Sequence, residues 1–188
     1  MTKDLHKLSR QELGQLFPII ISEPKSDWPD LFLQEKDHII ELLGKEIAVR
    51  VEHIGSTAVP NLHAKPTIDI FVEVPKGDDI KAKIMNIMTS NGYNYMHEQD
   101  SHIMVVKGYT PEGIKGQTYH IHMGTRDHKE LQDRLLFRDY LKSSISVADE
   151  YSKLKKNLAS LHKHDREAYT EAKTTFIKKA LEKAKKEL

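Results

Sequence analysis

The sequence of 188 residues contains no cysteine. This absence excludes a disulfide framework and thiolate chemistry, so any metal site must be built from His, Asp and Glu side chains. Long apolar runs are also missing: no segment reaches the length of a membrane span, and residues 1–11 are polar, unlike a signal peptide. We therefore expect a cytoplasmic protein that has no membrane partner.

The sequence also lacks a large excess of positive or negative charge, because the formal net charge is only +1. The distribution is nevertheless uneven, since residues 151–188 carry eleven Lys and Arg against five Asp and Glu. A lysine-rich helical face is usually solvated surface. We therefore interpret this segment as exposed helix and do not expect a nucleic acid partner, although the charge leaves that alternative open.

Strand patterns occur in the first two thirds of the chain. Residues 47–51 alternate between apolar and other side chains, which predicts a strand that runs directly into Gly55. Residues 67–74 form a second predicted strand, with one apolar face and one face that carries Asp69, Phe71 and Glu73. Two or three further strands are predicted, because residues 93–97, 103–106 and 117–123 have β-type composition, the last two joined by a turn at residues 110–113.

Helical patterns occupy the other segments. Apolar residues recur at helical spacing between Asp27 and Gly44, which predicts a half-buried helix there. Further helices are predicted from candidate capping residues at Ser9, Asp127, Ser146 and Asp165, and another is predicted to open with Asp78 and Asp79. The order of elements predicts one α/β (α+β) domain over residues 1–188, with an N-terminal extension over residues 1–26 and helices packed on a mixed sheet over residues 127–188.

The loop after the first strand has the composition of a phosphate site. Gly55 lets the backbone approach a ligand closely, and the loop offers N–H groups together with the hydroxyls of Ser56 and Thr57. Lys65 is the best cationic partner for a phosphate, and His53 could bind one as well. A plain turn at Gly55, a solvated Lys65 and a His53 satisfied by backbone are the alternatives.

A metal site is predicted beside this loop. Asp69 lies near the start of the next strand, where its carboxylate could hold a divalent cation, and Glu73 follows on the same strand face. His120 and His122 are two residues apart on a predicted strand, so both rings leave on one face. Neutral imidazoles suit zinc, manganese or iron better than magnesium. The alternatives are a solvated Glu73, an Asp69 that caps the loop, and a hydrogen-bonded or exposed histidine pair.

Several longer blocks resemble one known family. Residues 53–60, followed by Lys65-Pro66 and Ile68-Asp69-Ile70, closely resemble the signature of the GrpB family, a branch of the nucleotidyltransferase superfamily. Later blocks that extend the resemblance over residues 27–180 are Tyr119-His120-Ile121-His122, Leu136 to Leu141, Tyr151 with Leu154-Lys155, and Tyr169 with Lys173, Phe176 and Ile177. The resemblance implies a nucleotidyltransferase-like fold, a short sheet flanked by helices.

Within that resemblance one position departs from the superfamily pattern. Active nucleotidyltransferases usually place a second carboxylate two residues after the first, so that both project toward the metals from one strand face. Asp69 matches the first acid, but the second position is Phe71. Glu73 keeps the face but sits about 7 Å beyond that position, given a strand rise of roughly 3.3 Å per residue.

Three functions fit these patterns. The first is metal-dependent nucleotidyl transfer to an unidentified acceptor, in which Ser56 and its loop hold the triphosphate, Asp69 binds Mg²⁺ or Mn²⁺, and Lys65 stabilises the developing charge. The second is a protein that binds a nucleotide or other phosphorylated small molecule without catalysis. The third is a hydrolase that uses His120, His122 and Asp69, with Zn²⁺ as an alternative metal. Several carboxylates around Ser56 would favour transfer, whereas Asp69 and histidines alone would favour the other two.

Overall fold

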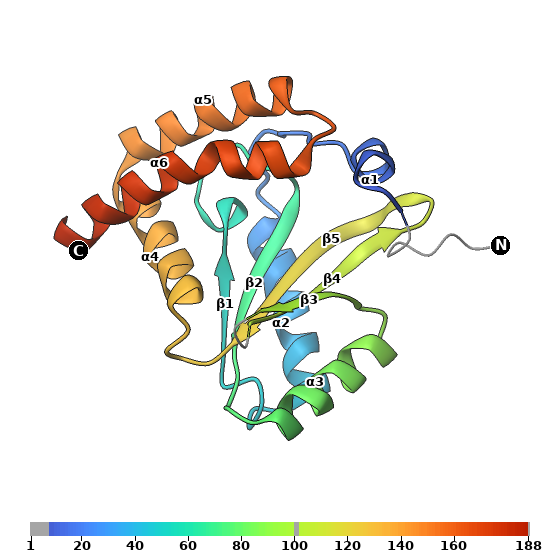
Figure 1. Cartoon of the computed structure of the whole chain (residues 1–188). Helices are drawn as coiled ribbons and strands as arrows, with labels where there is room; N and C mark the ends of the chain where they lie inside the picture. The colour runs from blue at the N-terminus through green and yellow to red at the C-terminus, as the bar shows by residue number, and fades with distance from the viewer. Residues whose placement is uncertain (1–7, 100–101, 188) are drawn as a thin grey trace.

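The computed structural model describes residues 8–99 and 102–187, which form a five-stranded sheet and six α-helices (Figure 1). The strand order is β1-β2-β5-β4-β3. β2 and β5 run parallel, and the other neighbouring strands are antiparallel. The strands are β1 (Arg50–Ile54), β2 (Thr67–Glu73), β3 (Asn94–Gln99), β4 (His102–Thr110) and β5 (Gly113–Gly124). The prediction of a mixed α/β fold is confirmed.

Helices cover both faces of the sheet (Figure 1). They are α1 (Arg10–Leu16), α2 (Trp28–Leu43), α3 (Asp78–Ser90), α4 (Lys129–Ser143), α5 (Ile145–Leu161) and α6 (Arg166–Glu187). Apolar residues of α2 and α3 form the largest core cluster with one face of the strands. On the other face α4 packs against β1 and β2, and α5 and α6 extend over the upper end of the sheet. Within the described residues, none of the helices has both the length and the apolar character of a membrane span.

The two faces of β2 separate as predicted, and most of the strand is buried on both. Ile68, Ile70 and Val72 are fully buried in the main core. Phe71 is also fully buried, on the opposite face, where it packs with Ile54 of β1 and with leucines of α4. The face that carries Asp69 is therefore covered in part by α4, while the Asp69 side chain remains 27% exposed.

The first predicted strand begins too early. β1 starts at Arg50, and Val49 is 55% exposed rather than part of an apolar face. The reason is a turn after Gly44, in which the N–H groups of Ile47 and Ala48 both bond to the Gly44 carbonyl. The turn buries the successive residues Ile47 and Ala48. In a strand, successive side chains point to opposite faces, so two neighbours cannot be buried on the same face.

The predicted helix starts are partly confirmed. Ser9 forms the expected capping box with Glu12, and the side chain of Asp165 accepts a bond from Ala168 N at 3.0 Å. Two caps were wrong. Asp127 accepts bonds from Thr125 and Lys76 instead of capping α4, and α5 follows Ser144 rather than Ser146, which lies inside its first turn. Capping residues one or two positions apart cannot be told apart from sequence spacing alone.

Residues 17–22 of the predicted N-terminal extension contribute to the packing. Phe17 is buried against the β4–β5 hairpin, and Ile19 is buried with Leu158 and Tyr169. The Ile19 N–H donates to the carbonyl of Lys163, between α5 and α6. This segment thereby links the N-terminal part of the chain to the helices that lie over the upper end of the sheet.

Candidate functional site

Gly55 joins β1 to a short 3-10 turn at Ser56–Ala58 and has a φ of 71°. A Cβ atom at this position would lie 2.4 Å from Oδ2 of Asp69. The sequence predicted a glycine that lets a ligand approach the backbone. The structure gives a different reason, because the close approach is made by the Asp69 carboxylate itself. The loop and Asp69 are therefore one structural unit.

The side chains of His53 and Thr57 brace this loop from inside. His53 Nε2 lies 3.0 Å from Thr57 Oγ1, which in turn donates to the carbonyl of Thr67 at 3.2 Å. Thr57 is buried, and the His53 ring stacks on Phe32 at 4.7 Å between centroids. Burial lowers the pKa of His53 to about 4, so its ring is neutral. These two side chains bond within the protein, and Ser56 carries the other hydroxyl of the loop.

Asp69, His120 and His122 come together on the same face of the sheet, as the strand alternation predicted. β2 and β5 pair in parallel with Asp69 opposite His120. His120 Nδ1 lies 3.1 Å from Asp69 Oδ1, and His122 Nε2 lies 4.0 Å from the same oxygen. One ligand atom from each of the three residues lies within 4.8 Å of the others. Two imidazole nitrogens and one carboxylate oxygen suit zinc, manganese or iron.

The other ring nitrogens of both histidines are held by neighbours. His120 Nε2 lies 2.8 Å from the Tyr109 hydroxyl, and His122 Nδ1 lies 2.9 Å from His102 Nε2. Such outer contacts fix the orientation of a metal-binding ring. Burial lowers the pKa of both His120 and His122, the latter well below its ordinary value. The rings are therefore neutral and able to coordinate a metal at physiological pH.

Replacing Tyr109 by phenylalanine is expected to weaken metal binding at Asp69, His120 and His122 by about 10–100-fold, because outer contacts of metal ligands have effects of this size. Titration calorimetry with Zn²⁺ and Mn²⁺ measures the change. Tyr119→Phe is the control, since Tyr119 lies on the same strand as His120 but on the opposite face. Equal metal affinities in the parent and Tyr109→Phe would contradict this role.

Three lysines surround the loop and Asp69. Lys155 of α5 donates hydrogen bonds to Ser56 Oγ at 2.8 Å and to the carbonyl of His63, and it is only 2% exposed. Lys65 and Lys173 are half-buried, and both interact with the charge of Asp69. Sequence reasoning found Lys65 but treated Lys155 and Lys173 as part of a solvated basic segment. Their presence in the family-like blocks was the signal that could have identified them.

The lysines are held in an environment that disfavours their charge. Burial, together with neighbouring cations, lowers the pKa of Lys65 and Lys155 to about 7 and that of Lys173 to about 8. Burial alone would raise the pKa of Asp69, but hydrogen bonding and charge interaction with His120 and the charge of Lys65 lower it instead. One ionised carboxylate therefore faces a larger number of cations, which favours an anionic ligand.

The other acids do not complete a two-metal site. Glu52, opposite Phe71 on β1, accepts bonds from Arg138 at 2.8 Å and Arg50 at 3.0 Å, so its charge is already balanced. Glu73 lies four residues beyond Asp69, about 13 Å along the strand, and is outside the described metal-ligand cluster. The structure therefore does not bring Glu73 together with Asp69, and a pair of Mg²⁺ ions held by carboxylates does not fit the described cluster.

Comparisons with known proteins agree with this architecture. The family described as "GrpB protein" matches residues 18–183. The UPF0157 protein YqkA of Bacillus subtilis is 35% identical over 159 residues, which are 85% of this chain and 45% of YqkA, so this chain spans less than half of that relative. The crystal structure of the conserved protein GrpB from Enterococcus faecalis has 33% identity and a TM-score of 0.77, over 89% of this chain and 98% of that chain.

A more distant likeness concerns the fold alone. A crystal structure of the Cid1 poly (U) polymerase matches with a TM-score of 0.53 at 14% identity, over 74% of this chain and 44% of that chain. Together with the preceding matches, this confirms the predicted family resemblance and the nucleotidyltransferase-like fold.

Proposed function

This chain belongs to the GrpB family, and from that premise we propose that it binds a nucleoside triphosphate or another phosphorylated small molecule beside a single divalent metal. The phosphates would lie between the Gly55–Thr57 loop and the lysines of the C-terminal helices. Asp69, His120 and His122 would hold the metal.

The observation that carries this proposal is the gathering of Lys65, Lys155 and Lys173 around Ser56 and Asp69. Buried cations without a matching number of anions destabilise a folded protein. A phosphate group supplies negative charge and strong acceptors at once, and it could take the place of Ser56 Oγ and the His63 carbonyl as the acceptor for Lys155. The site is therefore better suited to an anionic ligand than to a neutral one.

The donor set of the metal site supports Zn²⁺ or Mn²⁺ rather than Mg²⁺, because two of its three ligands are imidazoles. When bound, such an ion would neutralise phosphate charge and polarise a phosphoryl oxygen. The contacts around the three residues support this role. Tyr109 and His102 orient the rings of His120 and His122, and Asp69 remains ionised.

Two-metal nucleotidyl transfer is less well supported than binding with one metal. The second acid it needs is replaced by Phe71, which packs in an apolar cluster with Ile54 and leucines of α4. The loop faces Asp69 and histidines, the arrangement that favours either binding or single-metal hydrolysis. Hydrolysis is the second candidate, supported by the two histidines beside Asp69. Release of phosphate from ATP in the presence of Mn²⁺ or Zn²⁺, and its loss in His120→Ala, tests that candidate.

Binding is tested by thermal unfolding with ATP, without added metal. A ligand at about 100 times its dissociation constant adds about 2.7 kcal/mol to the stability of the folded state, which corresponds to about 5–10 °C for a protein of this size. We expect this shift in the parent and its loss in Lys155→Met, because Lys155 contacts Ser56 directly. Lys156→Met is the matched control, since Lys156 is exposed on the same helix. The proposal is wrong if no nucleoside triphosphate or inorganic polyphosphate shifts the parent, or if Lys155→Met responds like the parent.

The affinity for ATP is expected to fall as the pH rises from 7 to 9. Lys65 and Lys155 have a pKa of about 7 in the free protein, and a bound phosphate raises it by favouring the charged form. Below pH 7 both lysines are protonated in the free and in the ATP-bound protein, so the affinity for ATP is constant. Above pH 7 binding must take up protons, at a cost of up to about tenfold in affinity per pH unit for each lysine.

Titration calorimetry at pH 7, 8 and 9 measures this fall, and buffers of different ionisation enthalpy measure the proton uptake. At least a tenfold loss of affinity between pH 7 and 9 is expected. Affinity that is constant or increases over this range would show that the lysines do not contact the phosphates.

A further inference from the structure

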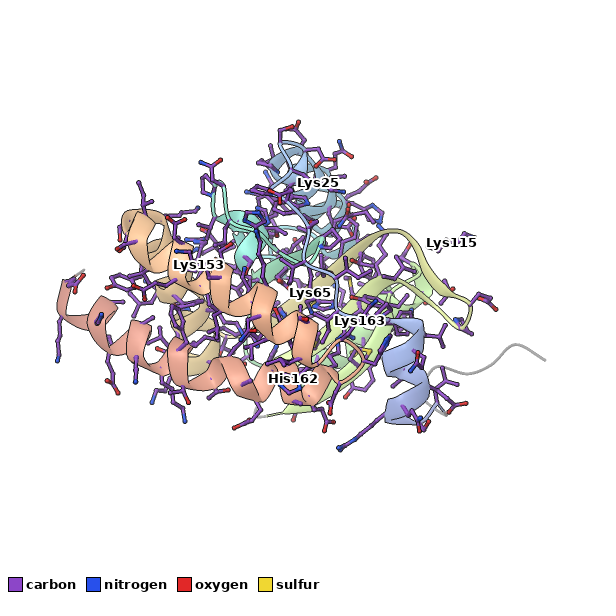
Figure 2. The ribbon with its side chains drawn as sticks, turned by 90° about the horizontal axis from the view of Figure 1, so that it is seen from above. Lys25, Lys65, Lys115, Lys153, His162 and Lys163 are labelled. Atoms are coloured by element: carbon purple, nitrogen blue, oxygen red, sulfur yellow. The ribbon has the colours of Figure 1, made fainter. Side chains whose placement is uncertain are left out.

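Basic side chains from distant segments lie at the end of the molecule where the loop before β2 is found. Figure 2 looks onto this end and labels Lys25, Lys65, Lys115, Lys153, His162 and Lys163. They come from the segment before α2, the loop before β2, the beginning of β5, helix α5 and the connection between α5 and α6. All of these segments lie at the upper end in Figure 1. We call these six residues the basic face.

The lysines of the basic face have no ion-pair partner among the described residues, whereas Lys76, Lys81 and Lys185 elsewhere pair with acids at 3.1–3.5 Å. Lys25, Lys115, Lys153 and Lys163 are also exposed. Glu23, close to Lys25 in the sequence, is bonded to His63 Nε2 at 2.7 Å instead. The positive charge of this face is therefore available to a partner.

The arrangement fits an extended polyanion better than a compact one. The lysines are distributed over five segments of the chain, so a single phosphate group cannot contact them all. Lys65 belongs both to this face and to the lysines around Asp69, which makes the face continuous with the phosphate site. A chain of regularly spaced phosphates matches this distribution of charge.

We propose that the basic face binds the phosphodiester backbone of a nucleic acid strand without sequence preference. This goes beyond binding of a small phosphorylated ligand and does not depend on it. It takes up the alternative that the sequence left open for the basic C-terminal segment, because Lys153 and Lys163 lie on the same end of the molecule as lysines from the first two thirds of the chain (Figure 2).

The test is fluorescence anisotropy with labelled RNA, single-stranded DNA and duplex DNA of mixed sequence, at several salt concentrations. Binding should weaken with salt, with a slope of log K against log [salt] of about −0.7 for each phosphate contacted on a single strand, or about −3 for most of the basic face. Lys115→Glu/Lys163→Glu should weaken binding at least tenfold. Preference among the three probes identifies the strand type, and each of them carries the proposed chemistry.

The matched control is Lys45→Glu/Lys83→Glu, which changes net charge equally on two exposed lysines at the opposite end of the sheet. We expect it to bind within about twofold of the parent. Equal weakening in both double variants, no binding at 50 mM salt, or displacement of RNA by an equal concentration of polyglutamate would overturn the proposal. The thermal shift with ATP, measured on the same variants, reports separately on the phosphate site, so failure of one proposal is distinguishable from failure of the other.

Discussion

Asp69→Asn is expected to abolish high-affinity divalent metal binding while leaving the chain folded. Asp69 supplies the sole carboxylate of the described metal cluster, and both histidine nitrogens approach the same oxygen of it. Even changes in outer contacts of metal ligands lower affinity 10–100-fold. Loss of a ligand with its charge should therefore weaken Zn²⁺ or Mn²⁺ binding by more than about 100-fold. Asparagine keeps the shape of the side chain, so the core around β2 should persist.

Calorimetric titration with Zn²⁺ and Mn²⁺ measures this loss, and circular dichroism with thermal unfolding verifies the fold. Glu73→Gln is the control, because it removes a carboxylate from the same strand without touching the cluster. The thermal shift produced by ATP without metal should persist in Asp69→Asn, since the lysines remain. Metal affinity equal to that of the parent would refute the assignment, and a loss in Glu73→Gln would place the metal elsewhere.

Gly55→Ala is expected to eliminate both metal binding and the ATP-induced thermal shift. Its Cβ would lie 2.4 Å from Asp69 Oδ2, so either the carboxylate or the loop must move. Movement of the carboxylate disrupts the metal ligands, and movement of the loop displaces Ser56 from Lys155. The positive φ of 71° adds backbone strain of about 1–3 kcal/mol in a residue other than glycine.

The chain offers a control that separates strain from the clash. Gly92 has a φ of 83°, but a Cβ there would meet no atom within 4 Å. Gly92→Ala should therefore lose comparable stability in denaturant unfolding and keep full metal and ATP binding. If Gly55→Ala also binds both ligands like the parent, the loop and Asp69 do not form the ligand site.

The pattern of alternate residues was sufficient to place the central part of the site. In a strand, successive side chains point to opposite faces, so the positions of Asp69 on β2 and of His120 and His122 on β5 determined which side chains share a face. The parallel pairing of these strands then brought the three residues together. The sequence also showed that no second acid stands two residues after Asp69, because that position is Phe71.

Contacts between distant segments could not be inferred from such local patterns. His53 and Thr57 look like ligand-binding residues in the sequence, yet they bond to each other and to Thr67 in the folded chain. Likewise, the spacing of charges did not distinguish Lys155 from the exposed Lys156 beside it. Helical periodicity indicates which side of a helix is buried, but it does not indicate which segment packs against that side.

The sequence by itself determined the order and type of most elements, the glycine after β1 and the face shared by Asp69, His120 and His122, because these depend on residues close together in the chain or on strand alternation. Only the tertiary structure decided that Lys155, 99 residues after Ser56, lies against that loop, that Glu52 is balanced by Arg138, and that lysines from five segments gather at one end of the sheet. Those contacts depend on how helices α4 to α6 pack over the sheet, which is fixed by shape and apolar burial summed over the whole chain.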